Sequence, residues 1–180
     1  MNTLKTYRDD KPREVKFIAK EETKEPEQPQ HKTITELIQM DMPNEAQQFI
    51  CKGIITEVRT DVDWRYLSCI TCKNGLDEER RCAKCNNSEY PMQRYRIMAI
   101  IFNGIESVNI VLFNKEAEKV IGKPIEKLID ISEKEKGKEQ VYELLRQCEG
   151  KQYTFKVKVA ESKYNNNREL KVHKTIAIED

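Results

Sequence analysis

Four cysteines in two closely spaced pairs constrain the fold of this chain more than any other feature of its sequence. Cys69 and Cys72 are separated by two residues, and Cys82 and Cys85 repeat that spacing after nine intervening residues. Two such short loops can bring four thiolates around one tetrahedral ion, and Zn²⁺ suits four sulfur ligands. Because the protein fills all four positions, we expect one structural Zn²⁺ with no open position for catalysis.

Three other interpretations of this quartet stay open on the sequence: an iron–sulfur centre, two disulfides, or thiols without a metal. The N-terminal residues lack the apolar core of a secretory signal, so we expect a reducing compartment, where metal ligation is favoured over disulfides. The two remaining cysteines, Cys51 and Cys148, fall in a predicted strand and on the apolar stripe of a predicted helix. We expect both to be buried as small hydrophobic residues.

The composition indicates one small domain preceded by a charged tail. Charged residues make up 35% of the 180 residues and apolar residues 38%, which leaves material for one small core. Residues 1–32 combine frequent charges and three prolines with few apolar side chains, and we expect them to be disordered ahead of a domain at 33–180. The apolar run 15–19 is the part of this tail that could add a strand or bind a partner.

Charge, hydropathy and motif content narrow the class of function. No run of about 18 apolar residues occurs, so the sequence does not predict a membrane-spanning helix. The 32 basic and 31 acidic residues nearly cancel, so that affinity for nucleic acid requires a local excess of basic residues. The sequence has no phosphate-binding glycine loop and no convincing serine, histidine and aspartate set, so we do not expect an enzyme.

Hydrophobic periodicity predicts a mainly β domain in which three strands, a helical crossover and two strands follow one another. We expect strands at 48–59, 94–103, 108–113, 153–161 and 169–178, and helical segments at 34–38, 114–121, 124–129 and 141–148. This is the element order of a five-stranded Greek-key OB barrel with its helical crossover between strands 3 and 4. Segment 61–91, which contains the quartet, falls between strands 1 and 2 and is predicted to be an inserted zinc ribbon.

Turn and cap residues refine this prediction. Gly53 predicts a bend or bulge in the first strand, and Asn103-Gly104 predicts the turn between the second and third strands. Asn114 is expected to cap the first crossover helix, and Gly122 is expected to end it.

The last hairpin has a predicted register. Pairing Val159 with Val172 and Phe155 with Ile176 places the apolar residues of the two strands on one side of the hairpin. This register implies a two-residue turn at 165–166. The opposite side then gathers Lys156, Lys158, Lys171 and His173. Residues 151–174 hold seven basic and two acidic residues, which predicts either a face that contacts phosphates or a solvated lysine surface.

Strand alternation predicts which side chains of the second and third strands face outward. Arg94, Arg96 and Phe102 share the more polar side of the second strand. The opposite, core-facing series is Tyr95, Ile97, Ala99 and Ile101. Phe113 lies opposite the apolar core positions of the third strand. An outward ring beside arginines suits single-strand binding, because every base offers a stacking face; the alternative is that these rings pack in the core or cover a helix.

Four runs combine a spaced metal site with a strand–helix motif in one order: 66–72 and 81–86, which hold the cysteine pairs, then 94–97 and 112–122. Together they resemble the C-terminal DNA-binding domain of the replication protein A large subunit, or a telomerase-associated paralogue of it, over residues 33–180. The resemblance implies an OB fold with an inserted zinc ribbon, binding of single-stranded DNA, other OB-fold subunits as partners and a nuclear location. Replication, repair and telomere maintenance are all compatible with it.

The resemblance also implies positions for base stacking, namely Phe113 and, at the mouth of the last hairpin, Tyr164. With these rings, the expected nucleic-acid contacts are Arg94, Arg96, Phe102, Lys156, Lys158 and Lys171. Two departures stand out, because the family carries a helix after the last strand that packs with other subunits, and further OB domains before this one. We therefore expect either part of a longer protein or a paralogue that works alone or with a partner.

Two functions of other classes compete with DNA binding. The first is a structural adaptor that assembles a multi-subunit complex, with which the charge-rich, nearly neutral helices in 114–150 are compatible. The second is an RNA-binding OB and zinc-ribbon protein, since OB domains also bind RNA.

Overall fold

The computed structural model describes residues 28–86, 90–162 and 167–179. Its elements, in chain order, are β1 (Gln30–His31), α1 (Ile34–Gln39), β2 (Phe49–Val58), β3 (Arg65–Ser68), β4 (Met92–Phe102), β5 (Ser107–Phe113), α2 (Asn114–Ile121), α3 (Ile125–Ser132), α4 (Gly137–Arg146), β6 (Gln152–Glu161) and β7 (Arg168–Glu179). None of the helices in these ranges is long and apolar enough to cross a membrane. The expectation of disorder for the tail falls on residues 1–27, outside the described ranges. Gln30–His31, which the sequence assigned to the tail, forms a strand parallel to β2.

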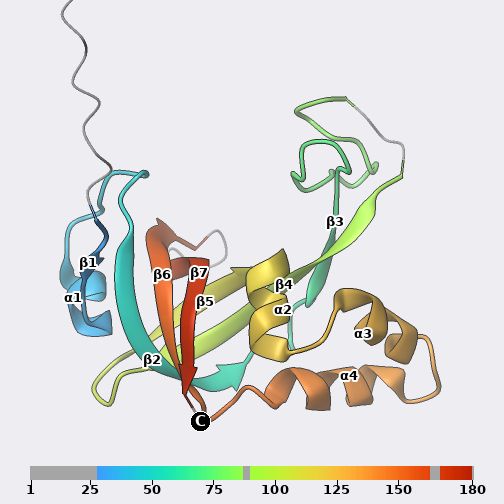
Figure 1. The fold of residues 1–180 in the computed structure, drawn as a ribbon. Coiled ribbons are helices and arrows are strands. Elements are labelled where there is room, and N and C mark those ends of the chain that lie inside the picture. The colour runs from blue at the N-terminus through green and yellow to red at the C-terminus, as the bar shows by residue number, and fades with distance from the viewer. Residues whose placement is uncertain (1–27, 87–89, 163–166, 180) are drawn as a thin grey trace, which may run out of the picture.

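Five strands pair around a closed ring (Figure 1). β2 pairs with β4 and with β6, β4 pairs with β5, and β6 pairs with β7, all antiparallel. The ring is completed by β5 and β7, which run parallel. The element order expected from the sequence, with three helices between β5 and β6, is present. Figure 1 shows the segment after β3 extending beyond the ring at the start of the long strand β4.

Alternation along the strands builds the core. Tyr95, Ile97, Ala99 and Ile101 of β4 are at most 1% exposed, as the sequence predicts for this series. Ile110 and Leu112 of β5 lie fully buried beside them. Cys51 and Cys148 are also buried, and burial raises the pKa of each thiol to about 12. Both are therefore small apolar residues of the core, as expected.

Gly53 and the following residues of β2 correct one expectation. The bulge of β2 lies between Ile55 and Glu57, not at Gly53. A Cβ atom at Gly53 would come within 3.1 Å of both Ile101 Cβ and Ile34 Cδ1. Glycine leaves room here for α1 and β4 to pack closely against the backbone of β2, which the sequence alone did not reveal.

The turn between β4 and β5 is longer than the predicted pair. Phe102 pairs with Ser107, so that four residues, 103–106, form the connection. The side-chain oxygen of Asn103 accepts hydrogen bonds from the N–H groups of Ile105 (3.0 Å) and Glu106 (2.9 Å). Asn103 therefore organises the turn through its side chain, and Gly104 supplies the positive φ of 95°.

The helical crossover closes one end of the ring. α2 begins at Asn114, with Phe113 rather than Asn114 in the capping position and no side-chain capping bond. Gly122 ends the helix in the left-handed conformation, as predicted. Figure 1 shows α3 and α4 packed side by side beyond α2.

Glu116 joins α2 to the part of β7 that β5 does not pair. The pairing of β7 with β5 involves Glu169, Leu170 and Lys171. Further along β7, the N–H of Thr175 donates to Glu116 Oε2 at 2.5 Å, and Lys119 Nζ donates to Glu116 Oε1 at 2.8 Å. The Glu116 carboxylate of α2 thus accepts the backbone N–H of Thr175 in the part of β7 that has no pairing with β5.

The register predicted for the last hairpin is wrong toward its turn. Val159 pairs with Leu170 and Phe155 with Thr175, because two irregularities in the pairing each shift the register by one residue. As a result Thr175 is buried, whereas Ile176 is 46% exposed. The last pair before the turn is Glu161 with Arg168, and the predicted two-residue turn falls on residues outside the described ranges.

Candidate functional site

The four cysteines of the quartet converge. Their Sγ atoms all lie within 4.8 Å of one another. Cys72 and Cys82 approach to 3.3 Å, and Cys85 lies 3.4 Å from both Cys69 and Cys82. A tetrahedron with metal–sulfur distances of about 2.3 Å has sulfur–sulfur edges of about 3.8 Å, so these side chains fit one four-coordinate metal ion.

Each cysteine pair is folded into the same turn. The N–H of Lys73 donates to the carbonyl oxygen of Cys69 at 2.9 Å, and the N–H of Asn86 donates to that of Cys82 at 2.8 Å. Lys73 and Asn86 each follow the second cysteine of a pair, and their φ angles are 63° and 50°. This left-handed conformation is unfavourable for a lysine, and it recurs at the same position after each cysteine pair.

The backbone of these turns favours thiolates. N–H groups of Cys72 and Thr71 point at the Cys69 sulfur and lower the pKa of that thiol to about 6. The N–H of Cys85 likewise lowers the pKa of Cys82. Hydrogen bonds to the sulfurs of Cys72, Cys82 and Cys69 favour the protonated thiol of Cys85 and raise its pKa to about 12. A cation bound by all four sulfurs would favour the thiolate of Cys85 as well, and its binding would release protons.

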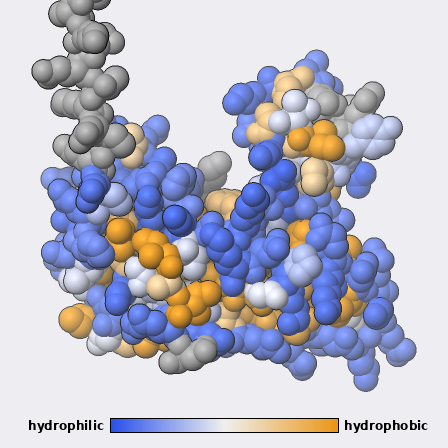
Figure 2. Space-filling view, viewed as in Figure 1, coloured by the Kyte–Doolittle hydropathy of each residue, from blue (hydrophilic) through white to orange (hydrophobic). Residues whose placement is uncertain are grey.

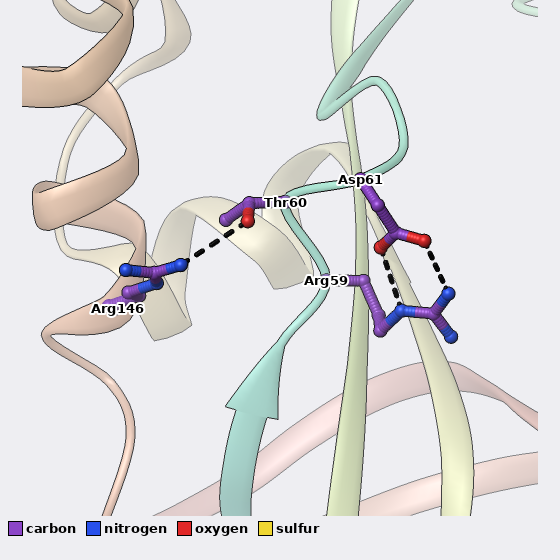
Figure 3. Close-up of polar contacts among 4 residues, drawn as sticks. All are labelled: Arg59, Thr60, Asp61 and Arg146. Atoms are coloured by element: carbon purple, nitrogen blue, oxygen red, sulfur yellow. Dashed lines mark hydrogen bonds and ion pairs between the residues drawn. The ribbon is translucent and has the colours of Figure 1, made fainter.

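The linker from β2 to β3 follows a path defined by polar contacts (Figure 3). Arg59 donates through Nε and Nη2 to the two carboxylate oxygens of Asp61, at 2.8 and 2.5 Å. Arg146, at the end of α4, donates to Thr60 Oγ1 at 3.3 Å. These solvent-exposed contacts orient the linker and contribute little to the free energy of folding.

Basic and aromatic side chains meet on the outward side of β4, β5, β7 and β6. We call this surface the basic face; it comprises Arg96, Phe113, Lys156, Lys158 and Lys171. Arg96 pairs with Phe113 across β4 and β5, and Lys158 pairs with Lys171 across β6 and β7. Lys171 in turn neighbours Val111, two residues before Phe113 on β5. The structure therefore brings together five of the residues that the sequence selected.

Like charges lie directly opposite one another on this face. Lys158 pairs with Lys171 and Lys156 with Lys174, and among the described residues no ion pair engages any of the four. Such cross-strand pairs are destabilising in the free protein. The Nε atom of Arg96 is buried without a hydrogen-bond partner in the same described ranges. An anion on this face would relieve the repulsion between the lysines.

Phe113 is half-buried at the end of β5. Its ring contacts the ring of Tyr66 edge to face, with the two centroids 6.0 Å apart and the planes at 84°. Tyr66 belongs to β3, which leads into the quartet, so that the aromatic pair joins the cysteine turns to the basic face. Sequence reasoning did not select Tyr66, although it opens the run 66–72; β3 is only four residues long and carries little periodic signal.

Arg94 does not lie on the open surface that the sequence predicted. It is 8% exposed, because β3 pairs with this part of β4 and covers it. Its Nε donates to the hydroxyl of the fully buried Ser68 at 2.6 Å. The side chain of Arg94 therefore links β4 to β3 through a hydrogen bond.

Two further expected contacts lie elsewhere. Phe102 is six residues beyond Arg96 on β4, about 20 Å away at the rise of a strand, and belongs to a different part of the surface. Tyr164 is outside the described residues.

Comparisons of this chain with protein families and with curated proteins identify the same family. Residues 48–179 match the family described as "Replication factor-A C terminal domain". The chain is 22% identical over 129 residues to a replication protein A 70 kDa DNA-binding subunit of Arabidopsis thaliana, covering 69% of this chain and 21% of that one. It is 26% identical over 136 residues to the replication protein A 70 kDa DNA-binding subunit of Gallus gallus, covering 71% and 22%. The chain thus spans about a fifth of the length of these relatives.

Two solved structures share the fold. A replication protein A heterotrimer bound to ssDNA superposes with a TM-score of 0.64 at 17% identity, over 84% of this chain and 37% of that one. Yeast RPA bound to ssDNA superposes with a TM-score of 0.61 at 19% identity, over 83% and 88%. At these identities the likeness is one of fold.

Proposed function

Because this chain belongs to the replication factor-A C-terminal domain family, we propose that it is a single-stranded-DNA-binding module of a replication protein A-like complex. The observation that carries this proposal is the basic face, where a half-buried ring lies among lysines that face one another. A base stacked on Phe113 and phosphates beside Arg96, Lys158 and Lys171 would use both features. Tyr164 is proposed as the second stacking ring.

We further propose that the ring of strands is a Greek-key OB barrel and that segment 61–91 is its zinc ribbon. The pairing order β2-β4-β5-β7-β6, with β5 and β7 parallel, supports the first part. Four converging thiols with short sulfur–sulfur distances support Zn²⁺ in the second. The ion would be structural: it would hold the turns that position β3, and through Tyr66 the ring of Phe113.

The biological setting follows from the relatives' names. We propose a role in DNA replication, with other OB-fold subunits as partners, and hence a nuclear location. Repair and telomere maintenance are further settings in which the same binding chemistry would serve.

The double variant Lys158→Ala/Lys171→Ala tests the proposed face. Removing this pair of like charges should leave the melting temperature unchanged or raise it, because the pair is repulsive in the free protein. The affinity for a labelled single-stranded oligonucleotide should fall at the same time. Lys127→Ala/Lys134→Ala, which removes one exposed lysine in α3 and one just after it, is the matched control and should bind as the wild type does. Equal affinity of both double variants would remove the basic face from the binding site.

A further inference from the structure

A groove of about 610 Å³ lies on the outer surface of the ring. It is bounded by the end of β1, the start of α1, the middle of β2 and the turn after β4. Figure 2 shows hydrophobic side chains gathered on this part of the molecule, over β2 between α1 and the β6–β7 pair. The proposed function leaves this groove unused.

The edge of β2 is interrupted at the floor of the groove. β1 pairs with β2 as far as Ile50, and β4 begins to pair with it at Ile54. Backbone groups of alternate residues point to the same edge of a strand. The N–H and C=O of Lys52 therefore point to the same edge as those of Ile50 and Ile54, into the interval between β1 and β4. Within the described residues, neither neighbouring strand pairs with Lys52 on this edge. The groove therefore displays one backbone donor and one backbone acceptor side by side.

Aromatic and aliphatic side chains form the wall beside these groups. Phe102 pairs directly with Ile54, so the two side chains share the outer surface. Phe102 is partly exposed, Ile54 is 37% exposed, and Ile105 in the turn is 78% exposed. A flat ring entering the groove would meet the side chain of Phe102 while its edge faced the backbone of Lys52.

The charges around the groove are mainly basic. Lys32 and Lys52 line it, against one carboxylate, that of Glu36. Glu36 accepts a hydrogen bond from the N–H of Thr33 at 2.7 Å, so its charge is already engaged in capping α1. Lys52 contacts Glu179 at 3.8 Å, but both side chains are more than half exposed, which makes this ion pair weak.

We propose that this groove is a second nucleotide subsite for single-stranded DNA, in which Phe102 contacts the base, the backbone of Lys52 hydrogen-bonds the base edge, and Lys32 and Lys52 hold phosphate. A nucleobase edge carries the adjacent donor and acceptor that complement those of Lys52. Ile50 of the groove pairs directly with Lys156 of the basic face across β2 and β6, so one strand of DNA can pass from the basic face to the groove. The inference rests on the proposed function and extends it beyond the residues of the basic face.

The test uses a labelled 12-nucleotide oligodeoxythymidylate, within the roughly 4–16 nucleotides that one OB fold covers. Phe102→Leu should weaken binding about fivefold or more, because it removes the stacking face. Phe102→Tyr keeps the ring and should bind as the wild type does. Lys52→Ala, at an exposed position, should also weaken binding, and a thermal melt of each variant shows that it is folded.

Hydrogen exchange at the Lys52 amide provides an independent readout. The oligonucleotide should slow this exchange in the wild type and should not slow it in Phe102→Leu. If folded Phe102→Leu and Lys52→Ala bind with wild-type affinity while Phe113→Ala does not, the subsite is wrong and the proposed function stands. DNA binding without protection of the Lys52 amide would also overturn the subsite. If the wild type does not bind the oligonucleotide, both proposals fail.

Discussion

The ring of Phe113 lies where β5 ends and α2 begins, in contact with Tyr66 and partly open to solvent. We expect Phe113→Ala to weaken binding of single-stranded DNA by about 1–3 kcal/mol, with little dependence on base sequence, because stacking tolerates every base. The loss of folding free energy should stay below the ~3–5 kcal/mol typical of a fully buried phenylalanine. A DNA titration paired with a thermal melt of the same variant measures both quantities.

Tyr66→Phe is the control for this prediction, since it keeps the ring that contacts Phe113 and removes only a hydroxyl. It should bind as the wild type does. Wild-type affinity in folded Phe113→Ala, or a melting temperature lowered as far as core truncation lowers it, would contradict the stacking role.

At the level of single residues, the alternation of apolar and polar residues along a strand predicts burial well. It fails where a neighbouring strand that the sequence did not predict covers the side chain. The core series of β4 from Tyr95 to Ile101 follows directly from the pattern of apolar residues. Arg94 has the outward parity that its polarity suggested, yet it is buried because β3 covers this part of β4. The residues around Arg94 do not predict that β3 covers it, because the position of β3 depends on the fold of the segment that contains the cysteine turns.

At the level of elements, the two cysteine turns would depend on the zinc ion proposed for their four thiols. We expect Cys82→Ser to lower the zinc content of the purified protein and to unfold segment 69–85, while much of the ring of strands survives. Metal analysis together with far-UV circular dichroism measures both effects. Cys148→Ala removes a thiol outside the quartet and should keep one zinc per chain. Full zinc occupancy in Cys82→Ser would exclude Cys82 from the site.

The link between α2 and β7 predicts a dependence of stability on pH. Burial raises the pKa of Glu116, but hydrogen bonds from Lys119 and from the N–H of Thr175 outweigh it, so that the net pKa is lowered. A carboxyl whose pKa is lower in the folded state stabilises the fold above its unfolded pKa, and this stabilisation is lost as the pH falls through the folded pKa. Glu116→Gln should therefore lower the stability near pH 7 by ~1–2 kcal/mol and lower it less near pH 3.

Thermal melts at the two pH values measure this difference. Glu118→Gln changes an exposed carboxylate on the same helix and should show a much smaller effect at either pH. If Glu116→Gln lowers the stability by the same amount at both pH values, a role for the ionised carboxylate is contradicted.

Most helices and long strands were predictable from the sequence, whereas the two shortest strands and the irregular pairing were not. The helix ended by Gly122 and the strands with strong alternation follow from local signals. β1 and β3 contain two and four residues, too few for a periodic pattern, and they exist because they pair with β2 and β4. The register of β6 and β7 shifts next to Thr175, whose N–H donates to Glu116 of α2, and the pattern of apolar residues alone therefore misplaced Ile176.

At the level of the whole molecule, a near-neutral chain should bind DNA with a marked dependence on salt. Residues 151–174 concentrate basic charge, and lysines of the basic face would displace counterions from phosphates. Each neutralised phosphate contributes about 0.7 to the slope of log affinity against log salt for single strands, so Lys156→Ala/Lys158→Ala should reduce that slope by roughly 1.4. Titrations at several salt concentrations measure it, and an unchanged slope would leave these lysines as solvated charges.

The proposed function depends on a preference of this domain for single-stranded DNA. Fluorescence-anisotropy titrations of the protein with labelled single-stranded DNA, single-stranded RNA of the same sequence and duplex DNA, at one salt concentration, test it most directly. We predict that single-stranded DNA binds more tightly than either of the others, because bases must be unpaired to stack on Phe113. Tighter binding of RNA would identify an RNA-binding protein, and no binding of any of the three would identify a structural adaptor; either result would contradict the proposed function.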